Sequence, residues 1–223
     1  MTTIVAVRHG ETAWNREGRM QGWAPVPLND RGCEQAAAAG RWLAREYDVD
    51  RVHASDLLRT RQTVDELLAH LDLDESRVSY EPAWRERDVG VYQGLSYEDV
   101  EDRFPDFGLS EPAADAAHRT PESGESLAGV SKRVGERFEE LLGACAPDET
   151  RLVVAHGGPI YMLLGHVKDV DVASAVLDHH QDNCGVTAFE HDPETGETRV
   201  DCENRTEWRA TEDAIEADWD SAE

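Results

Sequence analysis

The chain has 223 residues, which suits one large domain and is enough to bury a core without disulfide or metal crosslinks. Acidic residues outnumber basic ones by 47 to 22, and a formal net charge of −25 disfavours binding to nucleic acids and anionic membranes. The four cysteines form no CxxC pair, and no stretch resembles a secretory leader or a membrane span. We therefore expect a cytoplasmic protein with reduced thiols.

The first half of the chain alternates between strand-like and helix-like segments. Four apolar residues at 4–7 predict a strand buried on both faces of a sheet. Residues 29–47 predict a helix that Asn29 or Asp30 caps, and 51–55 predicts a second strand. That strand leads into a leucine-bearing helix that begins near residue 57.

The second half continues the alternation and ends differently. A helix is predicted over about 124–142, and "RLVVAHGG" at 151–158 predicts a strand followed by a glycine turn that opens a helix through residue 164. Segments 185–190 and 198–203 flank "HDPETGE" and predict a hairpin.

Strands that alternate with helices predict an α/β fold. We expect a three-layer α/β/α sandwich with a mostly parallel central sheet and a cap-like insertion, which is the acidic, proline-containing segment 104–124. Residues 1–210 are predicted to form a single domain, and the acidic residues 211–223 a flexible tail. The sequence carries no signal for oligomeric state, so a homo-oligomer stays open.

Titratable side chains follow three predicted strands, in "RHGETAWN", "SDLLRTRQT" and "VVAHGG". Because function gathers at the carboxyl ends of strands in such sheets, we expect Arg8, His9, Arg59 and His156 to meet there. In a protein of net charge −25, a cationic cluster is costly unless an anion occupies it. Arginine matches phosphate oxygens with a planar fork, so the cluster predicts a phosphate site.

A neutral imidazole in this cluster could donate a hydrogen bond or attack phosphorus. The neighbouring arginines favour the neutral form, because like charge lowers the pKa of histidine. Attack also needs a proton for the leaving oxygen, and "WRERDVGVYQG" supplies Glu86 for this purpose. One carboxyl group can be the general acid in one half-reaction and the general base in the next.

These segments together resemble the histidine phosphatase superfamily, which contains the cofactor-dependent phosphoglycerate mutases. The resemblance rests on "RHGET" with Asn15, "SDLLRTRQT", a Glu-x-x-x-Gly-x-x-x-Gly segment, "GES" and "AHGG", in that order. It implies that His9 is the nucleophile that becomes phosphohistidine, while Arg8, Arg59 and His156 hold the transferred phosphoryl group. Glu86 would protonate the leaving group and later activate water.

The resemblance also implies the surroundings of the phosphoryl group. Asn15 and the Gly157 amide would assist phosphate binding, Thr12 and Gln21 would face the substrate, and Asn183 would support the pocket from behind. The substrate would be a small-molecule phosphate ester. The chemistry needs no metal and no cofactor, because cations supplied by the protein can stabilise the charge on phosphorus.

Three functions compete on the sequence. Mutases of this superfamily resemble one another in an insert after the acid glutamate that carries a lysine and paired arginines. Here 89–125 contains no lysine, and its only bases are Arg103, His118 and Arg119, so a phosphomonoesterase is favoured over a mutase. A non-catalytic module that binds a phosphorylated ligand is the third reading, disfavoured because the nucleophile and the acid are both present.

Two further features are ambiguous. "LDHHQDN" clusters histidines and acids at 177–183, but we interpret it as a polar lead-in to the next strand rather than a metal site. Trp14 and Trp23 flank the nucleophile loop and are equally consistent with core, rim or substrate contact.

The charge balance predicts how salt affects stability. The only lysines are Lys132 and Lys168, and a dense acidic, lysine-poor composition is typical of proteins from salt-loving organisms, although a merely acidic protein would also have it. Salt screens repulsion between surface carboxylates. We therefore expect the thermal unfolding midpoint to rise in concentrated potassium chloride. An equal midpoint in dilute buffer would contradict a halophilic origin.

Overall fold

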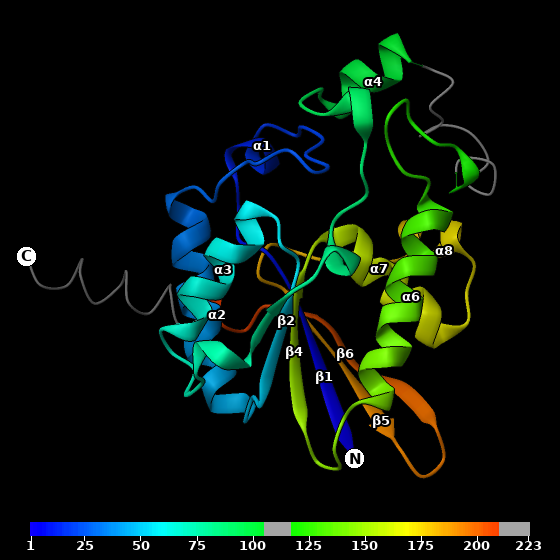
Figure 1. The fold of residues 1–223 in the computed structure, drawn as a ribbon. Coiled ribbons are helices and arrows are strands. Elements are labelled where there is room, and N and C mark those ends of the chain that lie inside the picture. Colours follow the sequence, from blue (N-terminus) through cyan, green and yellow to red (C-terminus); the bar gives the residue numbers. More distant parts are fainter. Residues whose placement is uncertain (105–116, 210–223) are drawn as a thin grey trace, which may run out of the picture.

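A six-stranded sheet with the order β3-β2-β4-β1-β5-β6 organises the part of the chain that the computed structural model describes, residues 1–104 and 117–209 (Figure 1). Strands β3, β2, β4 and β1 pair in parallel, whereas β5 runs antiparallel to β1 and β6 antiparallel to β5. The strands are β1 (Thr2–Arg8), β2 (Arg51–Ala54), β3 (Val78–Tyr80), β4 (Thr150–Ala155), β5 (Val186–Asp192) and β6 (Glu197–Arg205).

The central strand β1 is buried on both faces, as its apolar run predicts. Side chains alternate along a strand, so Val5 and Val7 point to one face and Ile4 and Ala6 to the other. Each face joins a separate apolar cluster. The sheet is therefore the middle of three layers, and the predicted α/β/α arrangement is confirmed.

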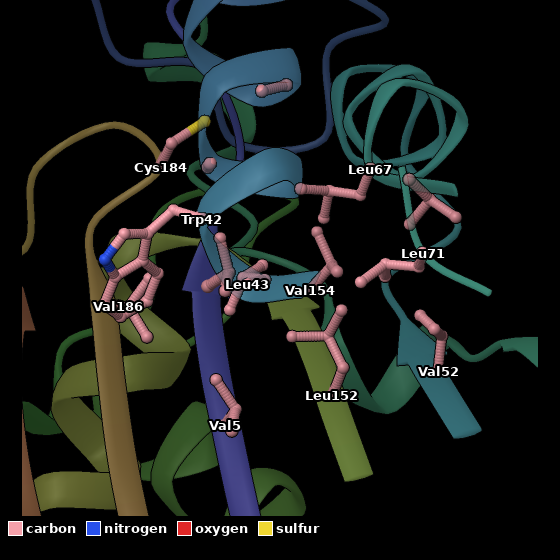
Figure 2. Packing of buried hydrophobic residues seen from close by; sticks show 14 of the residues in the cluster. Val5, Trp42, Leu43, Val52, Leu67, Leu71, Leu152, Val154, Cys184 and Val186 are labelled. Carbon is pink, nitrogen blue, oxygen red and sulfur yellow. The ribbon is translucent and has the colours of Figure 1, made fainter. Parts of the chain in front are cut away.

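Helices α2 (Asp30–Glu46) and α3 (Leu58–Leu68) cover one face of the sheet (Figure 1). Asn29 caps α2 by accepting a hydrogen bond from the Gly32 amide at 2.8 Å. Figure 2 shows Leu43 of α2 and Leu67 of α3 packed over the strands. Burial of such a leucine contributes about 1.5–3 kcal/mol, so this cluster accounts for much of the stability of the fold.

Helices α6 (Leu127–Gly143), α7 (Gly157–Lys168) and α8 (Val172–Leu177) lie on the other side of the sheet (Figure 1). Phe138 of α6 meets Phe189 of β5 edge to face, with ring centroids 5.5 Å apart. A Cβ atom at Gly165 of α7 would lie 2.6 Å from the Ala175 Cβ of α8, so glycine permits the close approach of these two helices.

Apart from η1 (Glu75–Arg77), which directly precedes β3, the short elements follow strands and lie near the carboxyl edge of the parallel strands. They are α1 (Ala13–Arg16), η2 (Pro82–Trp84), η3 (Gly90–Tyr92) and α4 (Tyr97–Arg103). Helix α4 lies beyond that edge, at the top of Figure 1. It begins with a capping box between Ser96 and Asp99.

The predicted strands and long helices are confirmed, with their ends shifted by a few residues. The short elements α1, η1, η2, η3, β3, α4 and α8 were not predicted. Within α2, Ala38 and Trp42 are buried while Ala44 is exposed.

Other expectations concern the ends and the insertion. Most of the predicted cap-like insertion, 105–116, and the predicted tail lie outside the described residues, so the domain limits stay a prediction. All four cysteines are free thiols. Among the described helices, none has the length and apolar character needed to cross a membrane.

Candidate active site

Sheet register brings the three predicted junctions together. Arg8 is level with Ala155 across β1 and β4, and Ala54 is level with Val154 across β2 and β4. The ladder extends past the strand ends, because the His9 amide donates to the Ala155 carbonyl at 3.0 Å and the Ser55 amide to the Val154 carbonyl at 2.9 Å. His9, Ser55 and His156 therefore leave neighbouring strands at the same edge.

A cavity of about 420 Å³ opens at this edge. Its wall combines cationic, amide and apolar groups. The lining residues are Arg8, His9, Trp14, Asn15, Gly18, Arg19, Met20, Gln21, Gly22, Arg59, Glu86, Arg87, Val89, Leu127, Gly157, Gly158, Tyr161 and Val176. This is far more space than one phosphate group needs, so the cavity can hold the remainder of a small ester as well.

His9 is buried in the wall with its tautomer fixed by the backbone. Its Nδ1 lies 2.7 Å from the Gly10 carbonyl, which can only accept, so Nδ1 carries the proton. Its Nε2 accepts a hydrogen bond from Arg59 Nε at 3.2 Å. Burial, then the charges of Arg59 and Arg8, hold the pKa of His9 well below its ordinary value. The ring is thus neutral at pH 7, with the lone pair at Nε2.

The two arginines are held by neutral carbonyl groups. Arg59, only 1% exposed, donates from Nη2 to the Gly22 carbonyl at 2.9 Å and from Nη1 to the Ala24 carbonyl at 3.3 Å. Burial lowers the pKa of Arg59 to about 10, so it stays charged at neutral pH. Arg8 donates from Nη1 to the Gln181 carbonyl at 2.5 Å, and its buried Nε has no partner within the described chain.

His156 lies beside His9, with ring centroids 5.1 Å apart and an angle of 61° between the rings. It is fully buried and does not itself line the cavity. Its Nε2 is 2.9 Å from Ser55 Oγ. Burial, followed by the charge of Arg59, keeps the pKa of His156 well below the ordinary value, so this imidazole is neutral too.

Glu86 faces the cluster from the loop after η2. Its Oε1 accepts from the Arg87 amide at 2.8 Å, and its Oε2 accepts from the Gly158 amide at 3.3 Å in the first turn of α7. Helix starts favour negative charge, which suits a carboxylate there. A Cβ at Gly158 would lie 2.3 Å from Glu86 Oε1, so glycine is needed for this approach.

Arg133 of α6 fixes the backbone of the Glu86 loop. It donates to the Ala83 carbonyl at 2.8 Å and to the Glu86 carbonyl at 3.0 Å. Glu125, from "GES", holds the same guanidinium through two hydrogen bonds of 2.9 Å. Trp23 adds a third anchor, from its Nε1 to the Glu86 carbonyl at 2.8 Å. Trp23 does not line the cavity, whereas Trp14 does.

The expected phosphate and substrate contacts divide into two groups. Asn15, Gln21 and Gly157 line the cavity, as expected for them. Thr12 does not, because it is fully buried and caps α1, exchanging hydrogen bonds with Asn15 in a capping box. Its side chain orients Asn15 rather than facing a substrate, which departs from the expectation. Asn183 donates to the His9 carbonyl at 3.0 Å and supports the nucleophile loop.

Several supporting residues were missed for identifiable reasons. Gln181 acts through its main-chain carbonyl, and such a role leaves no side-chain signal. Arg133 lies on the helix after the insertion, where a surface ion pair is the usual interpretation of an arginine. Ser55, by contrast, had a signal, since it follows β2 directly at the same edge as the predicted site.

The two histidines of the lead-in segment 177–183 contact residues near them in the sequence and on α7 and α8. His180 is 3.3 Å from Asp182, and His179 contacts the Ala175 carbonyl and Lys168. Within residues 1–104 and 117–209, no group of three or more His, Cys, Asp or Glu is arranged to hold a metal ion.

A model of one protein family, "Histidine phosphatase superfamily (branch 1)", matches residues 4–203. The chain belongs to this family. The sequence resemblance is therefore confirmed, and the chain is an enzyme of the phosphatase or mutase type.

Similar proteins carry both activities in their names. The chain is 30% identical to a metal-independent phosphoserine phosphatase of Arabidopsis thaliana over 79% of this chain and 73% of that protein. It is 32% identical to a 2,3-bisphosphoglycerate-dependent phosphoglycerate mutase of Methylobacterium radiotolerans, over 72% of this chain and 76% of that protein. A mycobacterial glucosyl-3-phosphoglycerate phosphatase, solved with VO3, superimposes with a TM-score of 0.79 and 28% identity, over 92% of this chain and 99% of that one.

The two buried imidazoles predict a stability loss in mild acid. Both have a lowered pKa in the folded state, so below about pH 6.5 the unfolded chain binds protons that the folded chain does not. The free energy of unfolding should therefore fall as the pH is lowered, by up to about 1.4 kcal/mol per pH unit for each histidine.

Urea unfolding between about pH 7.5 and 5.5 measures this dependence, above the range in which carboxylates titrate. A variant carrying both His9→Gln and His156→Gln is the matched control and should show a flatter profile. Equal slopes for the variant and the wild type would contradict neutral, buried imidazoles.

Proposed function

We propose that the protein is a metal-independent phosphomonoesterase that hydrolyses a small phosphorylated metabolite through a phosphohistidine on His9. The observation that carries the proposal is a neutral imidazole at the cavity wall whose Nε2 carries the lone pair and contacts the buried Arg59, while the half-buried Arg8 lines the same wall. Few groups other than a phosphoryl group match this combination of nucleophile and fixed positive charge.

Binding would place the phosphate against groups that lack a full set of partners. Arg8 Nε is an unused buried donor, and the Gly157 amide belongs to the first turn of α7, where amides have no partner inside the helix. Arg59 already contacts His9 Nε2, and its donor can turn to a phosphate oxygen as Nε2 becomes the attacking atom. Asn15 adds an amide at the wall.

In the first half-reaction His9 Nε2 forms a bond to phosphorus while the bond from phosphorus to the ester oxygen breaks. Glu86, in its protonated form, gives its proton to that oxygen and becomes a carboxylate. The proton stays on His9 Nδ1 and is donated to the Gly10 carbonyl, which disperses the positive charge of the phosphorylated ring. Arg8 and Arg59 stabilise the charge on the phosphoryl oxygens.

In the second half-reaction water replaces the alcohol. Glu86 takes a proton from water, the water oxygen bonds to phosphorus, and the bond to Nε2 breaks. His9 is then neutral again and Glu86 protonated, so phosphate leaves and the site is restored.

The bases of the insertion favour a phosphatase over a mutase. Arg103, His118 and Arg119 are all described, and none of them lines the cavity. The intervening residues 105–116 contain no lysine, arginine or histidine. A clamp for a second anionic group of the kind expected in mutases therefore has no source in this segment.

A phosphoglycerate mutase is the second candidate, because relatives at about the same identity bear that name. The phosphatases among the relatives support the first candidate equally by name and cover a similar share of the chain. A non-catalytic binding module is disfavoured because His9 and Glu86 are both present and both line the cavity.

A panel of phosphate esters in concentrated salt tests the proposal, with released phosphate as the readout. Wild type should release phosphate from one or more esters, and His9→Ala should abolish turnover and trap no phosphoryl group. His180→Ala removes an exposed imidazole and should leave turnover unchanged. Conversion of 3-phosphoglycerate with 2,3-bisphosphoglycerate as primer, without net phosphate release, would establish the mutase instead.

Glu86→Gln tests the assignment of the acid. Loss of the proton donor should slow esters in proportion to the pKa of their alcohol, so alkyl phosphates should lose about a hundredfold or more and nitrophenyl phosphate much less. Glu122→Gln, which neutralises an exposed carboxylate on the neighbouring loop, is the matched control. An equal loss for all esters would show that Glu86 is not the acid.

A further inference from the structure

His156 uses one ring nitrogen and leaves the other without a partner. Its Nε2 lies 2.9 Å from Ser55 Oγ, whereas Nδ1 is buried and forms no hydrogen bond with any described residue. The ring itself is fully buried. A neutral imidazole has a single N–H, so its tautomer decides whether Nδ1 presents a proton or a lone pair.

The Ser55 hydroxyl decides between these tautomers. Ser55 is fully buried, and its Oγ accepts a hydrogen bond from the Leu57 amide at 3.3 Å. The hydroxyl proton needs an acceptor, and His156 Nε2 is the one acceptor that the described residues place within reach of Oγ. Nε2 must then carry the lone pair. The opposite tautomer would leave both the hydroxyl proton and the Nδ1 lone pair unsatisfied in the interior.

We propose that Ser55 is a positioning residue that fixes His156 in the Nδ1–H tautomer, so that a neutral imidazole donates a hydrogen bond to the phosphoryl group carried by His9. The inference rests on the proposed function. The donor would lie close to the transferred group, because the His156 ring stands edge-on to the His9 ring at 5.1 Å between centroids.

The same tautomer then serves opposite purposes in the two rings. A carbonyl acceptor at Nδ1 of His9 places the lone pair at Nε2, where it accepts a hydrogen bond from Arg59 that can turn to a phosphate oxygen as Nε2 attacks. A hydroxyl donor at Nε2 of His156 occupies its lone pair and leaves the proton at Nδ1. His156 thus has no free lone pair to offer to phosphorus. The arrangement directs phosphorylation to His9, although both rings are neutral and buried.

Imidazole nitrogen NMR of ¹⁵N-histidine-labelled protein tests the tautomer, because protonated and unprotonated ring nitrogens differ widely in chemical shift. The His156 signals, assigned by their loss in His156→Gln, should show a protonated Nδ1 in wild type. Ser55→Ala should shift the population toward Nε2–H. Ser79→Ala is the matched control, since it removes a serine hydroxyl 2.9 Å from the ring of His53, and should leave the His156 signals unchanged.

Inorganic phosphate tests the donation. Titration of wild type should move the His156 Nδ1–H resonance, and Ser55→Ala should weaken phosphate binding and slow phosphoenzyme formation by about ten- to a hundredfold. Ser79→Ala should change neither. A wild-type His156 protonated at Nε2, an Nδ1–H resonance that phosphate leaves in place, or a Ser55→Ala variant that keeps the Nδ1–H tautomer would each overturn the inference.

A variant that does not fold, or a wild type without phosphatase activity, can each be distinguished from a failure of the inference about Ser55 and His156. If Ser55→Ala does not fold, the wild-type spectrum and its phosphate titration still decide the question. If wild type hydrolyses no ester, the proposed phosphatase activity fails, while the tautomer and the response to phosphate are measured without any turnover.

Discussion

Two arginines and two neutral imidazoles at the carboxyl edge of one sheet, all buried except the half-buried Arg8, are the constraint on which the rest of the structure depends. Isolated charges in an interior are costly, so each must be compensated. Here the compensation comes from carbonyl groups: Gly22 and Ala24 hold Arg59, and Gln181 holds Arg8. Carbonyl dipoles stabilise the guanidinium ions without cancelling their charge, so the cluster stays positive and suited to a phosphate dianion.

Two arginines outside the cluster have carboxylate partners instead of carbonyl groups alone. Arg85 pairs with Asp56 through two hydrogen bonds of 2.6 Å, and Arg133 pairs with Glu125 in the same bidentate way. These ion pairs fix loops rather than bind ligands. In a chain of net charge −25, carboxylates are abundant. Among the described residues, neither Arg8 nor Arg59 forms an ion pair with a carboxylate, although Glu86 lines the same cavity. The positive charge of the cluster is therefore available to a ligand.

Much of the site was predictable because its key residues follow strands directly. Parallel strands share a carboxyl edge, so the sequence positions of Arg8, His9 and His156 predicted that they meet. Glu86 was harder, because it reaches the cluster from a loop, and the resemblance to a family strengthened its assignment. The long elements were equally predictable, since continuous apolar runs mark β1 and β4 and a helical apolar period marks α6.

What the sequence could not predict are roles that depend on atoms rather than residue types. The Thr12 side chain is buried because it forms a capping box with Asn15. The same residue pattern would also allow that side chain to face a substrate. The short β3 and α8, of 3 and 6 residues, are too short to show a period. Hydrogen-bond direction at Ser55 is invisible in sequence, because it depends on which neighbours of the hydroxyl are donors.

The central claim is that the phosphoryl group passes through His9 before it reaches water. The stereochemical course at phosphorus tests this most directly, using a phosphorothioate ester made chiral with two oxygen isotopes and hydrolysed in water that carries the third. Each in-line displacement inverts phosphorus, so two displacements through phosphohistidine predict overall retention in the released thiophosphate. Overall inversion would mean that water attacks the ester in a single step, and it would contradict the covalent role of His9.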